Sequence, residues 1–290
     1  TLNPTGGTIT GTGFQVPGTL DLGGAVWSLN SGTWNITGTV QNGTVSLGGG
    51  SLAFPALCNF ARLSNLTING SLPNFSGGMR WNNVTLNGTL TATGQSEIRF
   101  EGNQTLTGTI VANTTSTLSL TPFSTGTLTI ASTAILRGGN ISLTDTPQCT
   151  GTPLTFAVMN NGTIDADTAG RTITLSAALT NSASGRIKVG LGNLIINGFN
   201  GNNGSIAQTG GSLTFGGNAN LASLGTYTRT GGSAAVTGVA DLANSSWSPL
   251  GLWAISGTIQ NGTVNLANGA FTFPGLCNFG RFSNLIVNGK

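Results

Sequence analysis

Three cysteines are the residues of this 290-residue chain whose chemistry is simplest to define. Cys58 and Cys277 lie in nearly identical segments, FPALCNFARLSN (54–65) and FPGLCNFGRFSN (273–284), whereas Cys149 lies in DTPQCTGTP. The chain has no histidine and no Cys-x-x-Cys pair, so we expect no zinc site. An odd number of cysteines leaves at least one thiol free or bonded to another chain, and oxidation would suit a secreted protein.

Carboxylates are the second group with chemical potential. The segment EIRFE places Glu97, Arg99 and Glu101 on one face of an expected strand, with Ile98 and Phe100 on the other. The two carboxylates would lie about 13 Å apart, too far for a paired-acid hydrolysis mechanism. We interpret the three charged residues as a row of ion pairs.

Asp165 and Asp167, with Arg171 nearby, are the best close pair of acids. They could contact Ca²⁺, but a calcium site needs about six oxygen ligands, and calcium-binding solenoids carry an acid in each turn. We interpret this segment as a solvated turn. We therefore expect no catalytic, cofactor-binding or metal-ligating residue, and no enzyme activity.

The composition narrows the class of protein further. Charged residues make up 6% of the chain, and the ten basic ones form no run, which argues against nucleic-acid binding despite a net charge of +3. No stretch of about 18 apolar residues occurs, so we expect no transmembrane helix. The 47 glycines separate segments rich in Val, Ile, Leu and Thr, which indicates a folded chain rather than a disordered one.

The elements that must position these residues are short strands. Segments such as LTING, VTLNGTL, GTLTIAS and RTITLSA alternate an apolar residue with Thr, Ser or Asn, which predicts strands with one buried face. Gly or Asn-Gly follows many of them, as turns with positive φ require. Good helix formers are scarce.

A recurrent step separates similar strands. Apolar pairs begin at Leu66, Val84, Leu106 and Leu128, and QTGGSLTF at Gln208 matches RTGGSAAV at Arg229. We predict an all-β parallel β-helix (β-solenoid) with about 20–22 residues per coil, running over 1–290 as one continuous domain of about 14 coils. In such a fold stacked asparagines can form hydrogen-bonded ladders at the turns, whereas stacked like charges would repel, which accounts for the low charge.

A longer repeat is superimposed on the coils. Residues 31–70 align without gaps on 250–289, with 24 of 40 positions identical, and the whole of 14–70 recurs as 234–289. The chain therefore holds one unit of about 219 residues and roughly the first 70 of the next. Because it opens with Thr1 and ends NLIVNGK where the first copy continues, we expect a window onto a longer array.

The motifs WNITGTVQNGTVSL, NVTLNGTL, ILRGGNISL and NNGTIDAD resemble the repeats of large bacterial surface and secreted proteins. These are the autotransporter-like and filamentous-haemagglutinin-like β-solenoids. The resemblance implies an extracellular or cell-surface adhesin, stalk or fibre built from tandem units, whose partners are neighbouring repeats or chains. It carries over no catalytic residue.

The function that we predict is a structural segment of such a fibre, without catalysis. The alternative is a glycan-binding module that uses the recurring tryptophans Trp27, Trp34, Trp247 and Trp253, although large aromatics are equally suited to a core. A polysaccharide-degrading β-helix enzyme is disfavoured because acids do not cluster. An ice-binding solenoid is disfavoured because the Thr-x-Thr pairs are unevenly spaced.

The cysteines leave three structural possibilities. Cys58 and Cys149 are about four coils, or about 20 Å, apart if both stay on the solenoid, and a disulfide tolerates a Cα separation of at most about 7 Å. Either a loop folds along the coils to join them, or each bonds to a neighbouring chain, or the thiols stay buried and free. We also predict that FPALCNFARLSN folds over the coils and buries Phe54, Leu57, Phe60 and Leu63.

Overall fold

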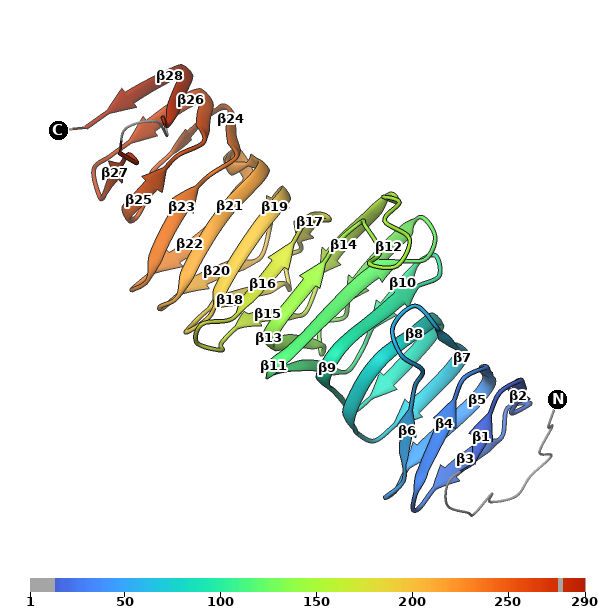
Figure 1. Ribbon diagram of the computed structural model, residues 1–290. Coiled ribbons are helices and arrows are strands. Elements are labelled where there is room, and N and C mark those ends of the chain that lie inside the picture. The colour runs from blue at the N-terminus through green and yellow to red at the C-terminus, as the bar shows by residue number, and fades with distance from the viewer. Residues whose placement is uncertain (1–13, 276–278, 290) are drawn as a thin grey trace. The chain divides into compact units, whose positions relative to one another are not determined.

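Parallel pairing between strands about one coil apart organises the computed structural model, which describes residues 14–275 and 279–289. The described chain is all-β, with 66% strand, and its stacked coils form a β-solenoid of about 13 turns. Figure 1 shows strands of successive coils lying side by side within each part of the chain. The predicted fold class is confirmed. No helix in the described part is long and apolar enough to cross a membrane.

The chain divides into two compact units, Thr1–Phe156 and Ala157–Lys290, and each is described by itself. The single continuous domain expected from the sequence stays a prediction. The first unit contains the strands β1 (Gln15–Val16), β2 (Thr19–Asp21), β3 (Val26–Leu29), β4 (Thr33–Ile36), β5 (Thr39–Leu47), β6 (Ser51–Ala53), β7 (Ala61–Asn69), β8 (Leu72–Asn87), β9 (Thr89–Phe100), β10 (Gln104–Leu106), β11 (Thr109–Pro122), β12 (Gly126–Ile130) and β13 (Ile135–Leu143).

The second unit begins within β14 (Phe156–Asn160). It continues with β15 (Thr163–Ala166), β16 (Thr172–Leu175), β17 (Ala178–Asn181), β18 (Arg186–Val189), β19 (Asn193–Asn202), β20 (Ser205–Gln208), β21 (Ser212–Asn220), the short 3₁₀ helix η1 (Leu221–Ser223), β22 (Thr226–Arg229), β23 (Ser233–Val236), β24 (Val239–Trp247), β25 (Gly251–Ile255), β26 (Thr258–Asn265), β27 (Gly269–Thr272) and β28 (Arg281–Asn288).

Coil length varies more than the sequence suggests. Ala61 on β7 pairs with Met79 on β8, a step shorter than the predicted coil, whereas Thr109 on β11 pairs with Ile135 on β13, a longer step. The extra residues of a longer coil lie in its turns and loops, because the paired parts of the strands stay in register. The predicted coil length falls between these two extremes.

Apolar residues facing inward form columns through each unit. Leu66 pairs with Val84 and Ile68 with Leu86, and all four are buried. The alternating Thr and Asn residues of these strands point outward, as their period of two requires. At the tight turns the coils touch through glycine, since a Cβ on Gly88 would clash with the backbone carbonyl of the preceding coil.

A ladder of buried asparagines supports the second unit, as predicted for stacked turns. Asn160 donates its amide to Asn181 at 2.7 Å, and Asn181 donates to Asn202 at 2.6 Å. Backbone N–H groups of Gly162 and Gly204 bond to the amide oxygens of Asn160 and Asn202. The ladder satisfies buried polar groups that would otherwise cost about 1–3 kcal/mol each.

The long repeat reproduces a specific turn in each unit. Asp21 accepts hydrogen bonds from the side chains of Gln41 and Asn42 and from the backbone N–H of Gly23. In the second copy, Asp241 accepts the corresponding bonds from Gln260 and Asn261 and from the N–H of Ala243. The two copies therefore share not only residues but also their side-chain hydrogen bonds.

One substitution between the two copies gives a testable prediction. Gly23 has φ of 55°, and its counterpart Ala243 keeps a similar φ of 45°, a left-handed conformation that disfavours a Cβ. Ala243→Gly should therefore raise the free energy of unfolding, by about 1 kcal/mol or less, and Gly23→Ala should lower it by about 1 kcal/mol. Denaturant unfolding of both variants measures the two changes.

The control is Ala254→Gly, because Ala254 is also exposed but lies within β25 and has no positive φ. There, glycine should destabilise by about 0.5–1 kcal/mol. If Ala243→Gly destabilises as much as Ala254→Gly does, the left-handed strain at Ala243 is not relieved by glycine and the prediction is wrong.

Candidate functional site

A disulfide between Cys58 and Cys149 is the centre of the candidate site. The two residues are 91 apart in sequence, and their Cα atoms are 5.5 Å apart. Cys58 lies in the loop 54–60 between β6 and β7, and Cys149 lies in the loop 144–155 between β13 and β14. Of the three arrangements that the sequence left open, the structure selects an intrachain bond within the first unit.

The loop 144–155, called the strap below, reaches Cys58 by folding back across the outer face of earlier coils. The side chain of Gln148 donates a hydrogen bond to the hydroxyl of Ser119 on β11. The backbone N–H of Gln148 donates to Glu97 on β9 at 3.2 Å. Cys58 and Cys149 start from coils that lie too far apart for a disulfide. The strap spans these coils and brings the two sulfur atoms together.

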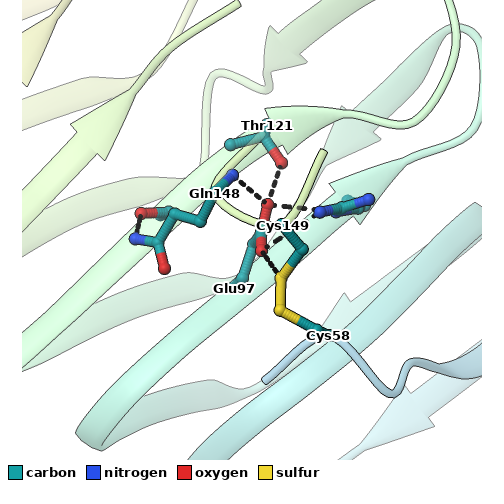
Figure 2. Close-up of a disulfide and its surroundings, with 7 residues drawn as sticks. Cys58, Glu97, Thr121, Gln148 and Cys149 are labelled. Carbon is teal, nitrogen blue, oxygen red and sulfur yellow. Dashed lines mark hydrogen bonds and ion pairs between the residues drawn. A yellow bond between two sulfur atoms is a disulfide. The ribbon is translucent and has the colours of Figure 1, made fainter. Parts of the chain in front are cut away.

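Glu97 lies beneath the strap and is fully buried. Figure 2 shows its carboxylate between Thr121, Gln148 and the disulfide. One oxygen accepts hydrogen bonds from the Thr121 hydroxyl at 2.8 Å and from Arg99 Nε at 3.0 Å, besides the bond from Gln148. The other oxygen lies 3.6 Å from Sγ of Cys149, a contact without a hydrogen bond because a disulfide sulfur carries no proton.

Arg99 completes the buried pair from the same strand, with only 4% of its surface exposed. Its guanidinium lies 4.2 Å from the centre of the Phe60 ring, in a cation–π contact. Phe60 belongs to the loop of Cys58, so both disulfide-linked loops contact one buried ion pair. A charge buried in this way is tolerated only when it is paired and hydrogen-bonded.

Two further arginines align with Arg99 on neighbouring coils. Arg62 pairs in register with Arg80, and Arg80 with Arg99, so three positive charges stack on the same outer face. Glu101 offsets the outer part of this row: it accepts three hydrogen bonds from Arg62, at 2.7–3.0 Å, and lies 3.9 Å from Arg80. Those hydrogen bonds raise the pKa of Arg62.

Arg80 also stacks on Phe123, 4.6 Å from the ring centre, while its buried Nε has no hydrogen-bond partner among the described residues. Three stacked arginines would repel one another if nothing offset their charge. The carboxylates of Glu97 and Glu101 and two aromatic rings offset it, so the row is stable. Each arginine follows the previous one by a single coil. This spacing is the sequence signal by which the row could have been found.

The predicted ion-pair row in EIRFE is partly corrected. Arg99 pairs with Glu97 as expected, at 3.0 Å, but Glu101 pairs with Arg62 and Arg80 on other coils. The strap covers Glu97, although the sequence suggested an outward-facing strand position. Glu97 is sealed from water, and its hydrogen bonds hold β9, β11 and the strap together.

The segment 54–65 covers the coils less completely than predicted. Leu63 is buried on β7, whereas Phe54, Leu57 and Phe60 remain half-buried and Cys58 is exposed. The strap holds this segment by one covalent bond rather than by a deep apolar contact. Cys277, in the second copy of the segment, lies outside the described residues.

The recurring tryptophans pack against each other in both copies. Trp27 and Trp34 meet edge to face at 4.8 Å, and Trp247 and Trp253 do so at 5.0 Å. All four are buried, so a sugar could stack on their rings only if neighbouring side chains moved away. The structure therefore favours the packing role for these residues.

Asp165 and Asp167 lie in the second unit. Asp165 on β15 faces Lys188 on β18 in register, and Asp167 accepts a hydrogen bond from Thr168. Within the described residues, no three acids, cysteines or histidines come together as a metal site.

An ice-binding face would need unbroken rows of threonines on successive coils. In the first unit such a row is broken, because Thr91 pairs with Val111, which pairs with Arg137.

Comparison with protein-family models, with curated proteins and with solved structures finds no match to this chain. The structure shows the β-solenoid fold that the resemblance to bacterial surface proteins implied, and the relationship to those proteins stays an expectation.

Proposed function

We propose that this chain is a structural segment of an extracellular bacterial fibre or stalk, built from tandem β-solenoid units and without catalytic activity. The observation that carries the proposal is the strap: a disulfide joins cysteines 91 residues apart and closes over a buried ion pair. Such a covalent bond across stacked coils resists separation of the coils. It suits a protein that is under tension.

The redox chemistry supports the same compartment. Disulfides persist in oxidising surroundings outside the cytosol, and the Cys58 side of this bond is exposed. The low charge supports an array as well, because coils stacked about 4.8 Å apart tolerate like charges only where carboxylates or rings compensate them. The repeated turn at Asp21 and Asp241 supports extension by identical units.

Electron microscopy of the full-length gene product tests this proposal. A unit of about 219 residues corresponds to about ten coils, so filaments with an axial repeat of about 50 Å are expected. Immunogold labelling should place them on the cell surface. Compact particles without an axial repeat, or labelling confined to the cytoplasm, would contradict the proposal.

A further inference from the structure

An amide-lined groove lies in the second unit and shares no residue with the strap. It has a volume of about 820 Å³, and six asparagines, Gln260 and Asp241 make up eight of its twelve lining residues. Asn218, Asn220, Asn244 and Asn284 are exposed. Such a concentration of carboxamides on one outer face is more than turn formation requires, since β21 carries Asn218 and Asn220 on a strand.

The groove follows consecutive coils in register. Asn220 on β21 pairs with Asp241 on β24, which pairs with Gln260 on β26. One polar side chain is therefore presented by each coil, at intervals of about 4.8 Å. That interval is close to the length that one sugar ring adds to an extended glycan.

Asp241 holds the amides of this row in fixed orientations. A carboxylate only accepts hydrogen bonds, so Gln260 and Asn261 must turn their NH₂ groups toward it, at 2.9 Å each. Asn284 in turn donates to the oxygen of Asn261 at 3.2 Å. The bonds from Gln260 and from the Ala243 N–H, with a smaller one from Asn261, hold the pKa of Asp241 below its ordinary value, so it stays ionised.

This orientation leaves specific groups for a ligand. Gln260 uses its amide nitrogen to bond Asp241, so its amide oxygen, which accepts no hydrogen bond from the described residues, is left for a ligand. Asn218 and Asn220, which also line the groove, each offer an amide donor and an amide acceptor. Polar groups fixed in advance bind a ligand at a lower entropic cost.

The chemistry favours one class of ligand over two others. Three neutral N–H groups already bond the Asp241 carboxylate, so a cation there would have to displace them and would meet the positive ends of their dipoles. A peptide that adds to a sheet needs an unpaired strand edge, but this groove lies on the outer face of paired strands. Neutral hydroxyl groups, each a donor and an acceptor, match paired amides.

We propose that this groove binds a neutral, extended oligosaccharide, with Asn218, Asn220 and Gln260 as its main hydrogen-bonding residues. Phe199 lines the groove but is buried, so no stacking platform adds to the affinity. Binding should therefore be weak, on the order of 1 mM. The proposal is independent of the fibre role, since either can hold without the other.

Saturation-transfer NMR on the full chain tests the proposal with three probes: cellohexaose, chitohexaose and maltohexaose. At least one should receive saturation, and the double variant Asn218→Ala/Asn220→Ala should weaken its binding about tenfold. Both residues are exposed, so the variant should keep the thermal stability of the parent. Asn268→Ala, an exposed asparagine of the same unit outside the groove, is the matched control and should bind like the parent.

Three results would overturn the proposal. The first is no saturation transfer to any of the three hexasaccharides. The second is transfer that persists unchanged in the double variant. The third is a response to Ca²⁺ alone, without any response to a hexasaccharide, which would make the groove a cation site.

Discussion

Cys58→Ser is expected to lower the free energy of unfolding of the first unit by about 2–4 kcal/mol, because it opens a loop of 91 residues. Serine is tolerated at this position since the side chain is exposed. Hydrogen exchange followed by mass spectrometry measures the effect locally. Protection should fall in the strap and in β9 and β11 beneath it, while β19 in the second unit keeps its protection.

The control for this prediction is a cycle of cysteine variants. Cys149→Ser and the double variant Cys58→Ser/Cys149→Ser should each match Cys58→Ser, because one bond is lost in all three. Cys277→Ser in every background prevents exchange of the freed thiol. A double variant that loses twice as much stability as either single one would mean that the side chains, not their bond, stabilise the unit.

Glu97→Gln is expected to destabilise the first unit by about 3–5 kcal/mol, because it leaves the buried guanidinium of Arg99 without its counter-charge. Glutamine retains the shape and an oxygen that can accept from Thr121 and Gln148. The loss should therefore reflect the missing charge rather than a cavity. Denaturant unfolding, with hydrogen exchange to locate the change, measures it.

Removing the opposite charge should restore the stability. In Glu97→Gln/Arg99→Met no buried charge remains unpaired at this position, so most of the loss should be recovered. Glu101→Gln is the graded comparison: its partner Arg62 is 29% exposed and can be solvated, so the loss should be about 1 kcal/mol. If Glu97→Gln and Glu101→Gln lower the free energy of unfolding equally, burial beneath the strap does not determine how much the Glu97–Arg99 ion pair matters for stability.

The candidate site could be predicted only in part, and the cysteines show why. Their odd number and the 91-residue separation left an intrachain bond, an interchain bond and free thiols open. The choice depends on the path of the strap, which has no periodic pattern. Its course is set by contacts to Ser119 and Glu97, and nothing in the sequence indicates that a loop from later coils contacts either residue.

The role of the tryptophans also could not be decided from the sequence. Their recurrence in both copies was visible in the sequence, but a repeated aromatic fits a core as well as a binding surface. Burial favours the core, and burial depends on which neighbours cover a ring. The amide groove was missed because its residues come from β19, β21, β24, β26 and β28, and no local pattern in the sequence marks them as a group.

The sequence by itself determined the coil. Inward and outward residues alternate along each strand, and a step of about 20 residues repeats, so local patterns specify both the strands and their stacking. Only the tertiary structure decided what covers the outer faces: the strap over Glu97 and Arg99, the row of three arginines, and the ordered amides around Asp241. Those contacts join residues from different coils and loops, and their energies depend on burial, which arises only when the coils are stacked.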